Sequence, residues 1–167
     1  MSQPATKRTP DRIAVDAVIL AMGPVLESLC EANTWLVLRL QAQDAVATIS
    51  SKELECIVLN LVSNALESIS LGGFVCVSTS VVVVARKRHV RLECTNDGEG
   101  LSPDSHTRLV RNGLSSKRRG VGLALRLVRE LARYAGGRVE AIRQPSGSAK
   151  FAVILPVLEA DEQKLGA

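Results

Sequence analysis

Aromatic residues are nearly absent from this 167-residue sequence, which has one Trp, one Tyr and two Phe. Proteins that bind single-stranded nucleic acid stack bases on aromatic side chains, so this class is disfavoured despite a formal net charge of +4. The positive charge gathers between residues 101 and 143, where ten Lys or Arg face three acids. We therefore expect an anionic nucleotide or an acidic protein as the partner, and no nucleic acid.

Patterns typical of metal clusters and of membrane spans are also missing. The four cysteines are scattered through apolar segments without a Cys-x-x-Cys pair, and the two histidines lie far from any plausible set of ligands. Buried, reduced thiols indicate a cytoplasmic protein. No signal peptide is visible, and no apolar run approaches the ~20 residues that cross a bilayer. We expect no membrane contact by this chain, although a longer protein that contained it could be membrane-anchored.

Apolar periodicity predicts long helices alternating with pairs of strands. A polar lead-in over 1–12, predicted to be disordered, precedes one domain over 13–158, and a flexible tail follows over 159–167. Helices are predicted over 13–32, 51–69 and 120–135, and strands over 35–41, 45–49, 74–85, 89–95, 138–143 and 149–156. This order predicts an α+β fold: a two-layer sandwich with a mixed, mostly antiparallel sheet and helices on one face.

Local signals refine these boundaries. Ser51 is the predicted N-cap of the second helix, and Gly72-Gly73 the predicted C-cap. A charged turn is predicted at 86–88. The connector over 102–119 has poor periodicity and many polar residues, so it is predicted to be a mobile lid.

Two asparagines stand one above the other in the second helix. Asn60, Asn64 and Glu67 recur at helical spacing on a face that the apolar stripe does not occupy. A polar stripe of this kind is usually just solvated. Asn, however, is a poor residue for a helix interior, because its side chain competes for the backbone. The pair therefore indicates a functional requirement.

Two glycine clusters flank the predicted lid. Thr95-Asn96-Asp97-Gly98-Glu99-Gly100 follows an apolar strand, and Gly120-Val121-Gly122-Leu123 opens a helix. Glycines let backbone N–H groups approach an anion, and a helix N-terminus adds a favourable dipole, so this layout predicts phosphate binding. No alternating βαβ pattern and no Gly-Lys-Ser/Thr sequence is present, which argues against a Rossmann or P-loop site.

In this order and spacing, the segments resemble the motifs of the ATP-binding domain of histidine kinases, a branch of the Bergerat-fold ATPases. Residues 60–65 (NLVSNA) resemble the N box, and 97–100 (DGEG) the first glycine box. Residues 115–117 (SSK) with 120–125 (GVGLAL) resemble the end of the lid and the second glycine box. The resemblance covers residues 15–157, nearly the whole chain.

The resemblance implies ATP and Mg²⁺ as cofactors. Asp97 would accept a hydrogen bond from the adenine amino group, beside Gly98, Gly100 and Leu101. Asn64 would bind Mg²⁺ through its amide oxygen, with Asn60 ordering the metal's shell. Lys117 would supply a countercharge, and the backbone of Gly120, Val121, Gly122 and Leu123 would face the phosphates. The aromatic motif common in the lids of these kinases is absent.

The implied function is the catalytic domain of a two-component sensor histidine kinase. The γ-phosphate of the bound ATP would pass to a histidine on a separate dimerisation domain, and indirectly to a response regulator. Neither His89 nor His106 is placed like a phospho-acceptor, so the chain alone is expected to be monomeric and inactive as an autokinase. The alternative is a stand-alone regulator of the anti-sigma-factor type with serine kinase activity. Those regulators resemble one another in a Glu where this chain has Asn60, which favours the histidine kinase.

Overall fold

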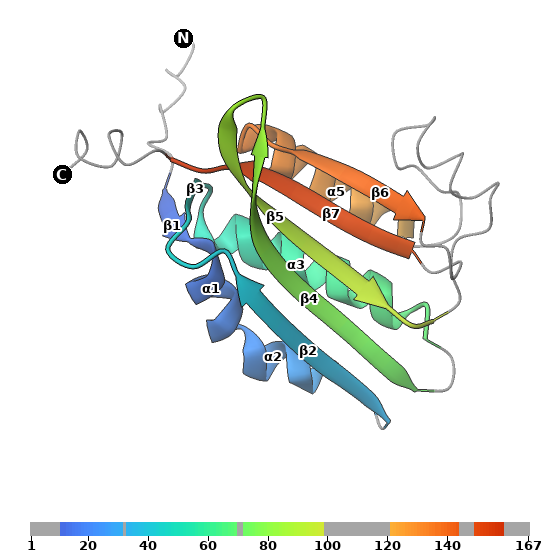
Figure 1. Cartoon of the computed structure of the whole chain (residues 1–167). Coiled ribbons are helices and arrows are strands. Elements are labelled where there is room, and N and C mark those ends of the chain that lie inside the picture. Colours follow the sequence, from blue (N-terminus) through green and yellow to red (C-terminus); the bar gives the residue numbers. More distant parts are fainter. Residues whose placement is uncertain (1–10, 32, 70–71, 99–120, 144–148, 159–167) are drawn as a thin grey trace, which may run out of the picture.

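The structure, a computed structural model, describes residues 11–31, 33–69, 72–98, 121–143 and 149–158 (Figure 1). Five strands form one sheet in the order β2-β4-β5-β7-β6. They are β2 (Thr34–Gln41), β4 (Gly73–Val84), β5 (Lys87–Asn96), β6 (Arg138–Arg143) and β7 (Ala149–Pro156). β2 and β4 run parallel, and the other neighbouring pairs run antiparallel. The predicted α+β fold with a mixed, mostly antiparallel sheet is confirmed.

The helices lie on one face of this sheet, as Figure 1 shows. They are α1 (Val15–Ala21), α2 (Gly23–Ser28), α3 (Ser51–Leu66) and α5 (Val121–Tyr134). The core fills the space between the two layers and is mainly aliphatic, with Met22, Cys94 and Phe151 among its described residues. The apolar stripe predicted for α3 is confirmed, since Leu54, Ile57, Val58, Leu61, Val62 and Ala65 are all buried.

The sequence predicts an apolar stripe on α5 at Leu123, Leu127, Val128, Leu131, Tyr134 and Ala135, and this prediction is partly wrong. Leu127 and Tyr134 are 44% and 74% exposed, whereas Leu125, Val128 and Ala132 are buried. The buried positions follow the i, i+3, i+7 spacing of one helix face. The helix has Leu residues on several sides, so its apolar content alone did not identify the face that packs against the core.

The first predicted helix is also wrong in part, because it is three elements. Residues Arg12–Ala14 form a strand, β1, which pairs antiparallel with β3 (Val46–Thr48). The helical part divides into α1 and α2 at Met22, two residues before Pro24, which lacks the N–H that a continuous helix needs there. At the opposite end of the domain's sequence, Val157 bridges to Ala47 of β3, and the Leu158 N–H donates to the Val46 carbonyl at 2.9 Å.

The N-cap of α3 is Ser50 and not Ser51. Ser50 Oγ accepts the Glu53 backbone N–H at 3.2 Å, and Glu53 Oε2 accepts the Ser50 N–H at 2.9 Å, which together make a capping box. The helix ends at Leu66 with Glu67 as its C-cap, short of the predicted end at residue 69.

Gly72 and Gly73 are therefore not the C-cap that the sequence predicted. Gly73 is instead the first residue of β4, and its N–H donates to the Asn33 carbonyl at 2.9 Å. The turn between β4 and β5 is Ala85-Arg86, both with positive φ (49° and 64°), not 86–88. Two such residues match the right-handed twist of a hairpin.

A row of charged side chains crosses the face of the sheet that the helices leave uncovered. Glu93 accepts hydrogen bonds from Arg91 and from Lys150, whose Nζ lies 2.6 Å from Glu93 Oε2. Arg91 also reaches Glu140, which pairs with Arg138. Burial alone would raise the pKa of Glu93, but the hydrogen bonds and charges of Lys150 and Arg91 outweigh it and hold this pKa below its ordinary value of 4.5.

The lowered pKa predicts a pH-dependent contribution to stability. A carboxylate whose pKa is depressed by folding stabilises the fold above its unfolded pKa, and loses this effect as the pH falls through the folded value. Glu93→Gln is therefore expected to lower the free energy of unfolding at pH 7, with the difference from wild type shrinking below pH 4.5. Urea unfolding at several pH values measures this. Glu130→Gln is the control, because Glu130 forms an exposed i,i+3 pair with Arg133, and an equal effect there would contradict the assignment.

Candidate functional site

One face of α3 carries polar residues at four-residue spacing, Cys56, Asn60 and Asn64, and Ser68 continues this spacing in the turn after the helix. Asn64 is buried, with 8% of its surface exposed, and Asn60 is half-buried. Asn60 Nδ2 donates to the Cys56 carbonyl at 2.7 Å, and Ser68 Oγ donates to the Asn64 carbonyl at 3.2 Å. The nitrogen of Asn60 is thus committed to its own helix, which leaves the amide oxygen as the end that can contact a ligand.

The last residues of β5 lie beside the C-terminal part of α3. Val90, Leu92 and Cys94 of β5 are core residues, so strand alternation places Asn96 on the same, helix-covered face. Asn96 is buried, with 7% of its surface exposed. Asp97, the next residue, is exposed, and its Oδ1 accepts the Phe74 N–H at 2.8 Å. The expectation that Asp97 accepts the adenine amino group stays a prediction.

Gly98 allows the chain leaving β5 to pass directly against the end of α3. A Cβ at this position would lie 2.0 Å from the Ser68 carbonyl oxygen, a separation that no side chain can adopt. The same close approach occurs at Gly73, where a Cβ would lie within 2.9 Å of three atoms of the Asp97 carboxylate. Sequence reasoning missed this role of Gly73, because a Gly-Gly pair after a helix is typical of a cap.

The start of α5 lies at the same end of the sheet. β6, which follows α5, begins opposite Ile154 and ends opposite Ala149, next to the residues that pair with the end of β5. α5 runs back along this direction, so it begins where β5 ends (Figure 1). Of the residues predicted to face phosphates, Val121, Gly122 and Leu123 form its first turn. Gly100, Leu101, Lys117 and Gly120 lie outside the described residues, as do His106 and the predicted lid.

The described residues suit a metal that keeps most of its waters. Among them, no group of three or more His, Cys, Asp or Glu could hold an ion. The amide oxygens of Asn60 and Asn64 are hard donors, one turn apart on α3, and Asn64 is largely withdrawn from solvent. Mg²⁺ is bound in nucleotide sites by one or two protein oxygens together with phosphates and water. The donor set therefore fits Mg²⁺.

Among the thiols, Cys56 contacts the amide stripe of Asn60 and Asn64, since its Sγ accepts a hydrogen bond from Asn60 Nδ2 at 3.5 Å. Cys76 and Cys94 are buried as predicted, whereas Cys30 and Cys56 are half-buried, and all four are free. Burial, with a smaller contribution from Cys76, raises the pKa of the Cys94 thiol to about 12. His89 lies in β5, with Nδ1 3.0 Å from the Lys87 carbonyl.

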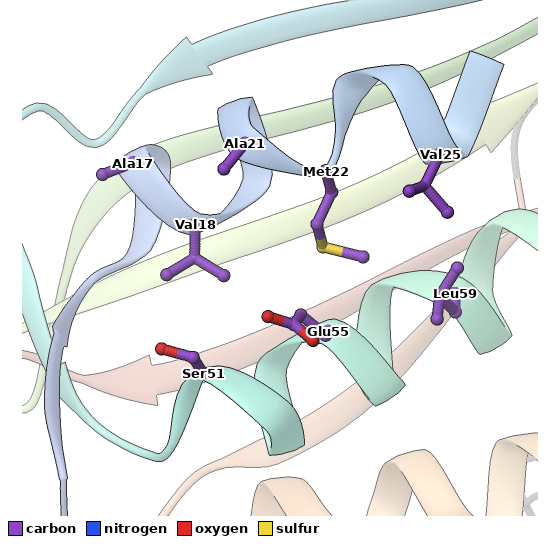
Figure 2. Close-up of a pocket in the computed structure, with 8 residues that line it drawn as sticks. All are labelled: Ala17, Val18, Ala21, Met22, Val25, Ser51, Glu55 and Leu59. Carbon is purple, nitrogen blue, oxygen red and sulfur yellow. The ribbon is translucent and has the colours of Figure 1, made fainter.

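A separate groove runs along another face of α3, between this helix and α1 and α2 (Figure 2). Its volume is about 490 Å³. It is lined by Ala17, Val18, Ala21, Met22, Val25, Ser51, Glu55 and Leu59. None of the predicted site residues lines it, so the groove and the amide stripe are different features of the same helix.

Comparison of the whole sequence with known protein families identifies the family of this chain. Residues 49–159, which contain α3, the end of β5 and α5, match the family described as histidine kinase-, DNA gyrase B-, and HSP90-like ATPase. The chain belongs to this family. Within it, the histidine protein kinase DivJ of Caulobacter vibrioides is 37% identical over 116 residues, which cover 65% of this chain and 18% of DivJ. The predicted histidine kinase type of ATP-binding domain is confirmed.

Solved histidine kinase structures share the fold of this family member. The mycobacterial sensor histidine kinase MprB superposes with a TM-score of 0.68 at 21% identity, covering 89% of this chain and 97% of that one. Full-length ShkA, in complex with AMPPNP, gives a TM-score of 0.74 at 19% identity, covering 93% of this chain and 33% of that one. The chain spans only 12–26% of the length of curated sensor kinases that it matches. No helix among the described residues is long and apolar enough to cross a membrane.

Proposed function

We propose that this domain binds ATP with Mg²⁺ and donates the γ-phosphate to a histidine on a separate dimerisation domain. The observation that carries the proposal is the pair of amides on α3, buried Asn64 with half-buried Asn60, in a domain whose relatives are sensor histidine kinases. Asn64 and Asn60 would hold Mg²⁺ through their oxygens. When bound, the ion would neutralise phosphate charge.

The remaining parts of the site follow the chain around the ends of α3 and β5. Asp97, Gly98, Gly100 and Leu101 are proposed for the base end of the nucleotide, and Lys117, Gly120, Val121, Gly122 and Leu123 for the phosphate end. At the phosphate end, the first turn of α5 offers backbone N–H groups and a favourable dipole. The acceptor domain would belong to the same full-length protein, with a response regulator downstream. We place this reaction in the cytoplasm, with this domain monomeric and in contact with neither nucleic acid nor membrane.

Phosphotransfer in trans tests the proposed function. The purified chain is incubated with γ-labelled ATP and Mg²⁺, alone and with a separate histidine-bearing helical dimerisation domain. Acid-labile label is expected on the added domain and not on this chain, because His89 lies in a strand with its ring nitrogen against a backbone carbonyl. Label on this chain alone would contradict the assignment. Label on a serine of a small protein partner would instead support the anti-sigma-factor type of regulator.

Base selectivity is a second expected result. Calorimetric titration with ATP, ADP and GTP should show tighter binding of the adenine nucleotides, with Mg²⁺ required. Asn64→Ala should abolish the Mg²⁺ dependence, because it removes the buried amide oxygen. Equal affinities for GTP and ATP would show that no group in the site distinguishes adenine from guanine.

A further inference from the structure

The groove between α3 and the α1–α2 pair is lined mainly by apolar side chains. Val18 and Val25 project from α1 and α2 toward α3, and Leu59 projects from α3 toward them (Figure 2). Met22, where α1 and α2 divide, lies between the two sides. Val25 is 54% exposed, and Leu29, one turn further along, is also exposed. An open apolar surface of this kind is typical of a contact with another polypeptide.

The walls of the groove determine which form of polypeptide can occupy it. Helices satisfy their backbone hydrogen bonds internally, so an extended segment finds no free strand edge here. The stretch of α3 from Ser51 to Leu59, which lines the groove, rises about 12 Å, or roughly two turns. A helix laid in a groove of this length contacts it with side chains three or four residues apart. Met22 is suited to such a contact, because its flexible side chain adapts to the shape of a partner.

One carboxylate lies among these apolar side chains. Glu55 lines the groove between Ser51 and Leu59 of α3 (Figure 2). Its carboxylate has no hydrogen bond or ion pair in the part of the chain that the structure describes, whereas Glu53 forms the capping box with Ser50. An uncharged helix would withdraw the carboxylate of Glu55 from water without giving it a partner, which is unfavourable. A helix with a Lys or Arg at this point avoids that penalty, so the charge favours a basic occupant.

We propose that this groove binds an amphipathic, basic α-helix of a partner polypeptide. Apolar side chains one turn apart on the partner pack on Met22 and Leu59, and a Lys or Arg beside them pairs with Glu55. The groove and the amide stripe of Asn60 and Asn64 lie on different faces of α3. The helix is therefore bound independently of the proposed ATP and Mg²⁺.

Selection of peptides on the purified full chain tests this assignment. The displayed library consists of helix-forming peptides of about 15 residues with one face randomised. Peptides that bind wild type are expected to carry apolar residues three or four positions apart and a Lys or Arg beside them. Ala21→Arg places a long charged side chain in the groove and should weaken their binding at least about tenfold. Leu20→Arg is the matched control, because Leu20 is an exposed neighbour on α1 that does not line the groove.

A charge reversal tests the contact with Glu55. Replacing the Lys or Arg of a selected peptide with Glu should weaken its binding to wild type at least about tenfold, and Glu55→Lys should restore it. Glu67→Lys, an equal change of charge at an exposed residue outside the groove, should not restore it. The three variants at exposed or half-buried positions of α1 and α3, Ala21→Arg, Leu20→Arg and Glu55→Lys, should keep the melting temperature of wild type.

Several results would overturn the inference. They are selected peptides without a basic residue, an equal loss of binding in Leu20→Arg and Ala21→Arg, and no restoration by Glu55→Lys. A selection that yields no peptide sensitive to Ala21→Arg would also overturn it. Displacement of the peptide by ATP with Mg²⁺ would place the peptide at the nucleotide site and would count against the groove. A wild type that bound a selected peptide in the groove but did not bind ATP would refute only the proposed function.

Discussion

Steady-state phosphate release by the purified chain with Mg²⁺ and ATP is expected to stay at the level of the Asn64→Ala variant. Hydrolysis needs a base for the attacking water, and a positioned general base is worth roughly 10²–10⁴-fold. One turn before Asn64 the chain has Asn60, an amide without basicity at neutral pH. Its nitrogen is bound to the Cys56 carbonyl, so its oxygen can orient a water or a metal ligand but cannot take the proton.

Asn60→Glu is the variant that tests this explanation. A carboxylate at residue 60 would stand on the same face of α3 as Asn64, and phosphate release is expected to rise by about 10²-fold or more. Asn60→Gln is the matched control, because it keeps an amide at that position and should stay at background. Wild-type turnover of about 1 s⁻¹, in the range of ordinary enzymes, would show that another base exists and would favour an ATPase over a phosphate donor.

Gly98→Ala is expected to lose most of the nucleotide affinity. The new Cβ would lie 2.0 Å from the Ser68 carbonyl oxygen, so either the end of β5 or the end of α3 must move. Overpacking of this kind typically costs about 1–3 kcal/mol of stability. Because Asn96 and Asp97 directly precede Gly98, the same movement displaces the base end of the proposed site. A drop of at least about tenfold in ATP affinity should accompany the loss of stability.

Gly137→Ala separates the two effects. A Cβ at Gly137 would lie 2.1 Å from the Ile154 carbonyl oxygen, a clash of nearly the same severity. Gly137 lies between α5 and β6, and β6 begins at the end of the sheet away from Asn96. This variant should therefore lose comparable stability and keep its affinity for ATP, measured by calorimetry below its melting temperature. If both variants lost affinity equally, the effect of Gly98→Ala would be global destabilisation.

Strong local signals made much of the fold predictable. The apolar stripe of α3 repeats over four turns, and the paired strands are separated by short turns, so their contacts are close in sequence. β1 has three residues, too few for a periodic signal, and it is defined by pairing with the distant β3. The parallel contact of β2 with β4 joins segments on either side of α3, and no local pattern in either strand reports it.

For the candidate site as well, some features could be predicted from the sequence and others could not. Asn60 and Asn64 could be selected because Asn is unusual in a helix, and the structure places them on one face. Asp97 drew attention by its charge, yet it is Asn96 that is buried. The alternation of Val90, Leu92 and Cys94 already predicts which of the two faces α3, so the signal was present in the sequence. The contacts of Gly73 and Gly98 depend on where α3 ends, which sequence patterns set only to within a few residues.

The small sheet formed by β1 and β3 has a mechanical consequence. β3 contacts β1 through Ala14 and Val46, and it also contacts Val157, so the first and last described segments of the chain meet at one corner. α3 starts beside this corner and ends at the proposed site, a distance of about 24 Å for its 16 residues. Any polypeptide joined to the chain before β1 or after Leu158 would be attached to the domain at this corner. In the proposed phosphotransfer, a modest rotation of the domain about this corner would displace the bound nucleotide at the other end of α3. The stiffness of the attachment would therefore affect how often the γ-phosphate reaches the acceptor histidine.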